Sequence, residues 1–334
     1  MATRAKKPLY RDAIRDALTD AMEEDGRVFL IGECVQGEST WGPSAGLDEA
    51  FPGRVRDTPI SEAAMVGHAI GAAMMGMHPV VEIMIGDFLT CAMDEIVNQA
   101  AKVRLMSGNQ LVAPIVIRAA TGTGRSSAGQ HSQSFESWFT HVPGLVVAVP
   151  STAQDAYDIL RNALEGEDPT LIFEYKRLYP MPGEWSRRPA LGPEDIGSAA
   201  VRLPGDDCTV IATGTILVEV LAVADDLRDE ASIEVVDPRY LWPLDMATIE
   251  ASVAKTKRAL IVEEAPYVGS FGAWLEGEIA RRAFGTLAEP VARLSGAHVP
   301  RSFAPGLEAA ARPRPELIRE TLLRMARGGI HASR

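Results

Sequence analysis

The sequence predicts an α/β protein built from two three-layer α/β domains, each with a mostly parallel sheet between helices. Two observations support this fold class. Short apolar runs alternate with segments of helical periodicity along most of the 334 residues, a pattern typical of parallel strands joined by helical crossovers. A stretch rich in proline and glycine interrupts the alternation near the middle of the chain, and the alternation then restarts.

The first predicted domain covers residues 1–180. Its expected strands are 28–31, 79–85, 114–118, 145–149 and 170–173. Its expected helices are 61–76, 87–106 and 153–164. Ser61 is a candidate N-cap, because a serine hydroxyl can accept a hydrogen bond from a backbone N–H of the first turn.

Residues 181–206 are expected to link the domains, and the second domain is expected to cover residues 207–334. Its expected strands are 209–212, 232–236, 259–262 and 291–294. Its expected helices are 216–229, 246–256, 271–283 and 315–326. This second block has the size of a small independent α/β domain.

Charge and cysteine content narrow the functional classes. The formal net charge of −12 argues against nonspecific binding to nucleic acid or to an anionic membrane. Three cysteines fit neither a zinc motif nor a disulfide framework, so a reducing cytoplasm is expected. The apolar segment 63–85 contains two histidines, a proline and a glutamate, which favours a buried helix and strand over a membrane span.

The first candidate site residue is Glu62, in the segment Asp-Thr-Pro-Ile-Ser-Glu. Pro59 disfavours helix for Thr58, and the helix then begins near Glu62, where its dipole favours a carboxylate. A rigidly held functional carboxylate and an ordinary helix-start glutamate both fit this pattern. Gly67 and Gly71 inside the same helix indicate close approach of another backbone, within the domain or from another subunit.

The second candidate is His131, which ends a loop rich in glycine and serine. The loop follows the expected strand 114–118, and ligands of open α/β sheets bind at the carboxyl ends of strands. A histidine there suits acid–base chemistry, although an incidental histidine on a flexible loop has the same pattern. Phe88 similarly follows strand 79–85, where it is either part of the core or a platform for a flat ring.

Nine segments, taken in order, form a distinctive series. They are Asp-Thr-Pro-Ile-Ser-Glu (57–62), Gly-His-Ala-Ile-Gly (67–71), Pro-Val-Val-Glu-Ile (79–83), Ile-Val-Asn-Gln-Ala-Ala-Lys (96–102), Gln-His-Ser-Gln-Ser (130–134), Pro-Gly-Leu-Val-Val (143–147), Val-Pro-Ser-Thr (149–152), Val-Val-Asp-Pro-Arg-Tyr-Leu-Trp-Pro-Leu-Asp (235–245) and Val-Glu-Glu-Ala-Pro (262–266). This series resembles one known family, the β subunits of thiamine-diphosphate-dependent 2-oxo acid dehydrogenases. The resemblance covers roughly residues 8–310 and is specific for subunit type rather than for substrate.

The resemblance implies a transketolase-like fold, with a pyrimidine-binding domain followed by a transketolase C-terminal domain. It implies oxidative decarboxylation of a 2-oxo acid of pyruvate or branched-chain type, with acyl transfer to a lipoyl group. The implied cofactor is thiamine diphosphate, with magnesium held mainly by a separate α subunit in an α2β2 heterotetramer. A lipoyl-bearing acyltransferase is the implied further partner.

The resemblance also implies roles for individual residues. Glu62 would hydrogen-bond N1′ of the aminopyrimidine and so activate the cofactor, which then acts as an electron sink. Met84 and Phe88 would pack on the aminopyrimidine. His131 would orient the 2-oxo acid and transfer a proton during acyl transfer, on a loop that the cofactor or the α subunit orders.

A potassium ion is a further implication of the resemblance. It would be bound by the backbone carbonyls of Ile115, Ala163, Gly166 and Asp168.

Some positions depart from the family pattern, and two other functions stay open. His68 replaces an apolar residue, Cys91 replaces a polar one, and the segment 298–303 departs from the pattern Asp-x-Pro-x-Pro-Tyr. The departure at 298–303 affects the part of the family pattern that is associated with packing of the C-terminal segment and with docking to an acyltransferase core. The alternatives are a split transketolase-like enzyme acting on sugar phosphates, in which Arg125 would bind phosphate, and a noncatalytic paralogue that stabilises an α partner.

Overall fold

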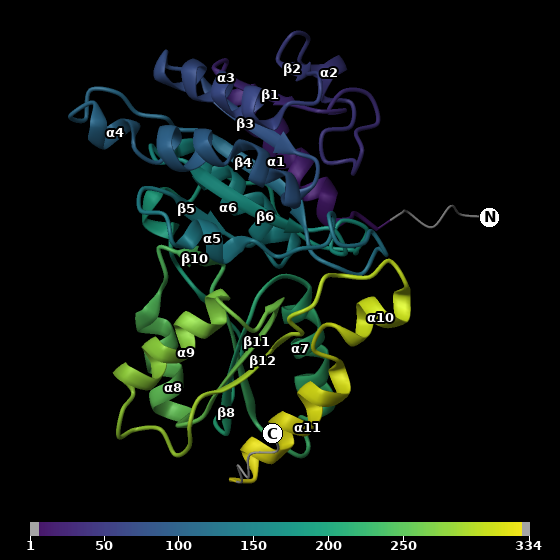
Figure 1. The fold of residues 1–334 in the computed structure, drawn as a ribbon, viewed down its shortest axis with the longest axis vertical. Coiled ribbons are helices and arrows are strands. Elements are labelled where there is room, and N and C mark those ends of the chain that lie inside the picture. The colour runs from purple at the N-terminus through teal and green to yellow at the C-terminus, as the bar shows by residue number, and fades with distance from the viewer. Residues whose placement is uncertain (1–6, 329–334) are drawn as a thin grey trace. The chain divides into compact units, whose positions relative to one another are not determined.

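The computed structural model describes residues 7–328. Its contacts group the chain into two compact units (Figure 1). Among the described residues, the first unit holds 7–121 and 138–196, and the second holds 122–137 and 197–328. The segment 122–137 follows a strand of the first unit, yet its contacts group it with the second.

The first unit contains a parallel sheet with the strand order β5-β6-β4-β3-β1-β2. The strands are β1 (Val28–Gly32), β2 (Val55–Asp57), β3 (His78–Ile83), β4 (Val116–Thr121), β5 (Val146–Ala148) and β6 (Thr170–Tyr175). All residues of β1, β4, β5 and β6 are buried, as expected for a parallel sheet covered on both faces.

Helices cover this sheet. They are α1 (Tyr10–Glu24), α2 (Leu47–Ala50), α3 (Glu62–Met74), α4 (Val103–Met106) and α6 (Ala153–Glu165), with the short helix α5 (Glu136–Thr140) between β4 and β5. Neither α1 nor β2 was anticipated from the sequence. Helix α1 packs against α6 and buries Ala13, Ile14, Ala17 and Leu18, whose spacing of three and four residues forms one apolar stripe.

The predicted continuous helix 87–106 is wrong. The structure instead has a 3-10 segment η1 (Gly86–Ala92), a π-helical segment η2 (Glu95–Ala100) and the short α4. The Ala101 N–H bonds the carbonyl of Ile96, five residues earlier, at 3.1 Å, which widens the turn. Such π segments are rare and occur frequently at functional sites.

The second unit contains a five-stranded sheet with the order β12-β11-β8-β9-β7, in which only β7 runs antiparallel to its neighbour. Its strands are β7 (Ala200–Leu203), β8 (Cys208–Ala212), β9 (Ile233–Asp237), β11 (Ala259–Pro266) and β12 (Ala292–Gly296), with a further short strand β10 (Tyr240–Trp242). Residues 181–206, treated as a linker in the sequence analysis, include β7 and the 3-10 turn η3 (Pro193–Asp195).

Helices cover both faces of this second sheet (Figure 1). They are α7 (Gly214–Asp226), α8 (Met246–Thr256), α9 (Phe271–Arg282), α10 (Pro305–Ala310) and α11 (Pro315–Ala326). Side chains of α7 and α11 share one apolar cluster with the sheet, and those of α8 and α9 share another. The prediction of two α/β domains with mostly parallel sheets is confirmed.

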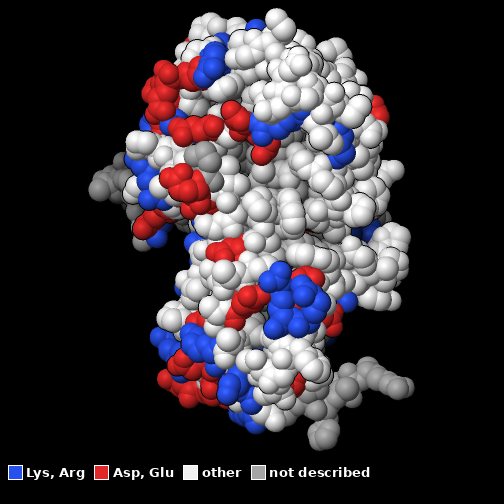
Figure 2. Space-filling view, turned by 90° about the vertical axis from the view of Figure 1, so that its left-hand side faces the viewer, with Lys and Arg blue, Asp and Glu red and all other residues white. Residues whose placement is uncertain are grey.

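The molecular surface is mixed in charge. Figure 2 shows basic and acidic side chains interspersed on one face, without a continuous basic surface on that face. Within residues 7–328, no helix combines the length and the apolar character that crossing a bilayer requires.

Candidate active site

The Glu62 carboxylate is held at the start of α3. The preceding loop is anchored by Thr58, whose N–H and hydroxyl both donate to the carbonyl of Gly32 at 3.0 and 3.2 Å. Ser61 caps the helix by accepting from the Ala64 N–H at 3.4 Å, as the sequence predicts. Glu62 is 8% exposed, and within residues 7–328 its carboxylate has no hydrogen-bond or ion-pair partner.

A turn at the carboxyl end of β3 carries Met84 and Phe88, both half-buried. The Phe88 N–H bonds the Ile85 carbonyl at 2.9 Å. A Cβ on Gly86 would lie 3.3 Å from the carbonyl oxygen of Ala120, so glycine permits close packing against the end of β4. Helix α3 packs against η1, so the segments that carry Glu62 and Phe88 are neighbours in the first unit.

Trp41 holds the backbone of Met84 through a hydrogen bond. Its indole N–H donates to the Met84 carbonyl at 2.9 Å. The ring also lies 6.1 Å from the ring of Tyr179, centroid to centroid. The carbonyl of Trp41 itself accepts from the Arg11 guanidinium at 3.4 Å. Trp41 thus connects helix α1 to the turn that carries Met84.

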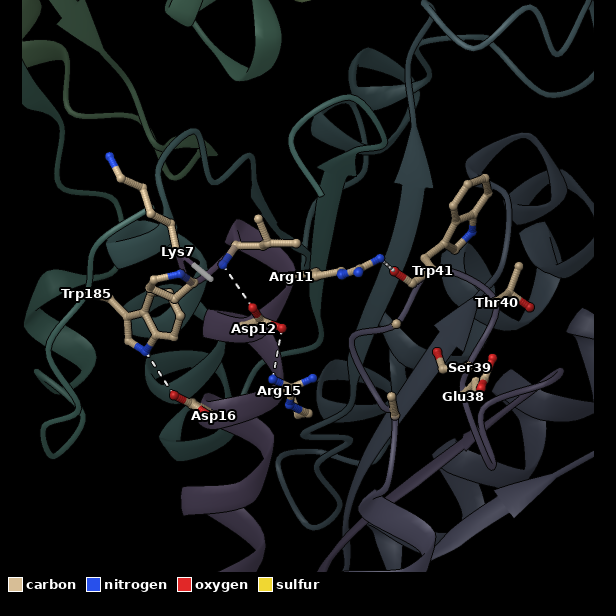
Figure 3. A pocket seen from close by; sticks show the side chains of 14 residues that line it. Lys7, Arg11, Asp12, Arg15, Asp16, Glu38, Ser39, Thr40, Trp41 and Trp185 are labelled. Carbon is tan, nitrogen blue, oxygen red and sulfur yellow. Dashed lines mark hydrogen bonds and ion pairs between the residues drawn. The ribbon is translucent and has the colours of Figure 1, made fainter. Parts of the chain in front are cut away.

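Trp41 also lines a cavity of about 750 Å³ between the start of α1 and the loop 38–45 (Figure 3). Its charged lining residues are Lys7, Arg11, Asp12, Arg15, Asp16 and Glu38. Several of these groups are already paired. Arg15 bonds Asp12 at 2.8 Å, and the Trp185 N–H donates to Asp16 at 3.1 Å. The cavity therefore has no strong preference for one sign of charge.

A buried ionic cluster lies on β3, the strand that precedes Met84, and on the neighbouring strands β4 and β6. Arg118, 1% exposed, binds Glu82 of β3 at 2.8 Å and both oxygens of Glu174 of β6 at 2.8 Å each. The Tyr179 hydroxyl donates to Glu174 at 2.8 Å. These four side chains connect β3, β4 and β6, and one of them, Glu82, is two residues before Met84 in the chain.

Burial and charge shift the ionisation of this cluster. Burial raises the pKa of Glu82, and Glu174 adds to that shift, although Arg118 opposes it. Burial also raises the pKa of Tyr179 well above its usual value, and the charge of Glu174 raises it further. Burial alone would lower the pKa of Arg118, but the two carboxylates outweigh burial and raise it.

His131 lies in the segment 122–137, which belongs to the second unit. It is half-buried, and its N–H bonds the Ala128 carbonyl at 3.3 Å. The hydroxyls of Ser132 and Ser134 are buried, and neither has a hydrogen-bond partner among residues 7–328. Glu62, Met84 and Phe88 therefore belong to one unit and His131 to the other.

Of the four residues considered for potassium, Ile115 immediately precedes β4, whereas Ala163, Gly166 and Asp168 lie at the end of α6 and in its connection to β6. The Ile115 carbonyl accepts from the Thr170 N–H at 2.9 Å, and the Asp168 carbonyl accepts from the Thr170 hydroxyl at 3.2 Å. The Ala163 carbonyl lies 3.5 Å from the position of a Cβ on Gly166. In the part of the chain that the structure describes, no cluster of three or more His, Cys, Asp or Glu side chains could hold a metal ion.

Several residues around these candidates were not predicted from the sequence. They are Trp41, Arg118, Glu264 and Glu308, which bond backbone groups or side chains far along the chain. Of these residues, only Arg118 could have been suspected from the sequence. It lies inside an apolar strand, and a buried charge there requires a partner of opposite charge.

The fold and both halves of the chain match transketolase domains. The model of the transketolase pyrimidine-binding domain matches residues 6–182, and that of the transketolase C-terminal domain matches residues 197–318. A solved structure described as a split-gene transketolase in an inactive β4 tetramer has a TM-score of 0.77, 21% identity, and coverage of 96% of this chain and 99% of its own. These matches define a transketolase-like protein.

Curated relatives narrow the class. The chain is 40% identical to pyruvate dehydrogenase E1 component subunit beta-2, mitochondrial, of Oryza sativa subsp. japonica, over 94% of this chain and 85% of that one. It is 39% identical to 2-oxoisovalerate dehydrogenase subunit beta of Bacillus subtilis (strain 168), over 95% and 98%. It is 38% identical to the beta subunit of acetoin:2,6-dichlorophenolindophenol oxidoreductase from the same organism, over 92% and 94%.

The chain belongs to the family of E1 β subunits of thiamine-dependent 2-oxo acid dehydrogenases. The resemblance identified from the sequence is thereby confirmed. Its relatives are subunits of heteromeric oxidoreductases.

This family implies thiamine diphosphate as cofactor. The residues present fit its aminopyrimidine. The buried Glu62 carboxylate has no partner within residues 7–328 and so remains available as an acceptor, and Met84 and Phe88 are half-buried apolar side chains on a neighbouring segment.

Proposed function

We propose that this chain completes the active site of a 2-oxo acid dehydrogenase together with an α subunit. Glu62 and His131 are its catalytic residues, and Glu62, Met84 and Phe88 bind the cofactor. The reaction is oxidative decarboxylation of a 2-oxo acid of pyruvate or branched-chain type, with acyl transfer to a lipoyl group. The observation that carries the proposal is the buried carboxylate of Glu62 at the start of α3, which has no partner among residues 7–328.

The cofactor, when bound, supplies a nucleophilic carbon and an electron sink for decarboxylation. Glu62 would share a proton with N1′ of the aminopyrimidine, because a buried acceptor that has no partner among residues 7–328 can form a strong hydrogen bond. Met84 and Phe88 exclude water from the ring and fix its plane. His131 orients the 2-oxo acid and donates or accepts a proton during acyl transfer.

The assembly is proposed as an α2β2 heterotetramer that works with a lipoyl-bearing acyltransferase. Magnesium is bound mainly by the α subunit. Potassium is bound by the carbonyls of Ile115, Ala163, Gly166 and Asp168; the carbonyls of Ile115 and Asp168 both bond Thr170, and the Ala163 carbonyl lies near Gly166. A cytoplasmic location and the domain boundaries 1–180, 181–206 and 207–334 also stay predictions.

The test measures decarboxylation by this chain assembled with its α subunit, thiamine diphosphate and magnesium, with an artificial electron acceptor. A panel of 2-oxo acids identifies the substrate. Turnover is expected only when both chains are present. Glu62→Gln is expected to lower kcat by about 100-fold or more, the size of a typical proton-transfer contribution.

The matched control is Glu49→Gln, since Glu49 is an exposed glutamate in the first turn of α2. Its kcat should stay within about twofold, as for a surface change away from the site. If a well-formed, cofactor-loaded heteromer turns over no 2-oxo acid, the proposal is overturned. Turnover of a ketose phosphate would then support the split-transketolase function, and no turnover of either would support a stabilising paralogue.

A further inference from the structure

The loop that carries His131 adopts a backbone that the loop residues alone do not favour. Four of its residues have left-handed φ angles: Gly122 at 85°, Gly124 at 90°, Ser126 at 54° and Ala128 at 65°. Ser126 and Ala128 are not glycine, so this conformation is unfavourable for them. Contacts outside the loop must therefore maintain it.

Two buried carboxylates of the second unit make those contacts. Glu308 of α10 accepts from the Gly124 N–H at 2.9 Å and from the Ser126 N–H at 3.1 Å, one bond to each of its oxygens. Glu264 of β11 accepts from the Thr123 N–H. Glu264 is 1% exposed and Glu308 is 4% exposed. Charge-assisted bonds from three N–H groups within residues 123–126 therefore hold the backbone of this segment.

Further bonds hold the Glu264 carboxylate and the backbone of the elements that carry both carboxylates. The Thr215 hydroxyl donates to Glu264 at 3.3 Å. The Arg301 guanidinium donates to the backbone carbonyl of Glu264 at 2.7 Å and to that of Ala311, just after α10. Arg301 therefore connects the strand that carries Glu264 to the end of the helix that carries Glu308.

The backbone of the same arginine lies beside the loop close to the histidine. Its carbonyl oxygen lies 3.5 Å from the position that a Cβ on Gly129 would take, and Gly129 is two residues before His131. Arg301 is 6% exposed. Arg301, in the segment 298–303 that departs from the family pattern, is therefore a buried neighbour of the loop.

We propose that Glu308, together with Glu264, is a positioning residue for His131: the two carboxylates hold the histidine loop through its backbone N–H groups. The inference rests on the proposed function for the role of His131, but the contact itself does not. Glu308 acts only through the loop backbone and not on the reacting atoms.

Hydrogen–deuterium exchange in the assembled heteromer tests the contact without any activity. Glu308→Ala should speed exchange of the Gly124 and Ser126 amides by about tenfold or more, the value of one lost charge-assisted hydrogen bond. Glu308→Gln keeps the volume and one acceptor oxygen, so it should give a smaller increase. The control is Glu316→Ala, because Glu316 is an exposed glutamate at the start of α11. Unchanged exchange in Glu308→Ala overturns the proposal.

A double-mutant cycle tests the positioning role. With a 2-oxo acid and the lipoyl acceptor, Glu308→Gln and His131→Ala should each lower kcat, and the double variant should be no slower than His131→Ala alone, because the two residues act as a unit. Equal kcat for Glu308→Gln and wild type, or additive losses in the double variant, would overturn the role. If the wild-type heteromer has no turnover, the proposed function fails while the exchange experiment still decides the contact.

Discussion

Replacing Arg118 with methionine should destabilise the first unit strongly. Arg118 is 1% exposed and makes three bonds of 2.8 Å to Glu82 and Glu174. Methionine fills much of the same volume but leaves two carboxylates buried without a cation. Breaking a buried ion pair in this way costs about 3–5 kcal/mol of unfolding free energy.

The assay is thermal unfolding of the assembled heteromer. At about 2–4 °C per kcal/mol for a unit of this size, the midpoint of the first unit should fall by roughly 6–20 °C. The control is Arg27→Met, since Arg27 forms an exposed ion pair with Asp25 and such pairs contribute at most about 1 kcal/mol. A fall no larger than that of the control would show that the buried ion pairs of Arg118 contribute no more to stability than an exposed pair.

The pH dependence of this loss has a definite sign. Burial raises the pKa of Glu82 above its usual 4.5, and loss of Arg118 should raise it further. A carboxyl with a raised folded-state pKa contributes stability that is complete below the unfolded pKa and is lost as pH rises. The deficit of Arg118→Met should therefore be smaller at about pH 5 than at about pH 8. The triple variant with Glu82→Gln and Glu174→Gln should recover most of the loss.

Three further predictions concern single contacts. Trp41→Phe removes the donor to the Met84 carbonyl, worth about 1 kcal/mol, so the KM for thiamine diphosphate should rise about fivefold with kcat nearly unchanged. Trp185→Phe is the control, and equal KM values for the two variants would contradict the contact. Thr152→Ala removes the N-cap of α6 and should cost about 1 kcal/mol in thermal unfolding, and no change would count against the cap. Burial raises the pKa of Cys208 to about 12, so its thiol should react with a disulfide reagent at pH 8 only after unfolding, and prompt reaction in the native protein would contradict its burial.

Much of the fold was predictable, because in strongly periodic segments the spacing of the apolar residues shows which positions are buried and whether the segment is a helix or a strand. The helices 246–256 and 315–326 and the strands around 209–212 and 259–262 match α8, α11, β8 and β11 closely. Segment 87–106 failed because helical periodicity does not distinguish a regular helix from 3-10 and π-helical turns, which tertiary contacts select. Strand β2 was missed because it is short and mostly exposed.

The candidate site was only partly accessible from the sequence. Glu62 was indicated by its position after a proline and a helix cap, and the structure finds that cap. The buried cluster joins Arg118 to partners 36 and 56 residues away, and no local pattern encodes such pairings. Glu308 bonds backbone N–H groups 182 and 184 residues earlier in the chain. Because nearly every residue type has a backbone N–H, such a contact leaves no pattern in the sequence.

The proposed activation of the cofactor by Glu62 can be measured as proton exchange on the cofactor itself. Exchange of the thiazolium C2 proton of thiamine diphosphate with deuterium oxide would be followed by acid quench and proton NMR in the cofactor-loaded heteromer. In Glu62→Gln we expect exchange about 100-fold slower or more, with the cofactor still bound and the Glu49→Gln control unchanged. Exchange at the wild-type rate in Glu62→Gln with bound cofactor would show that Glu62 does not activate the cofactor.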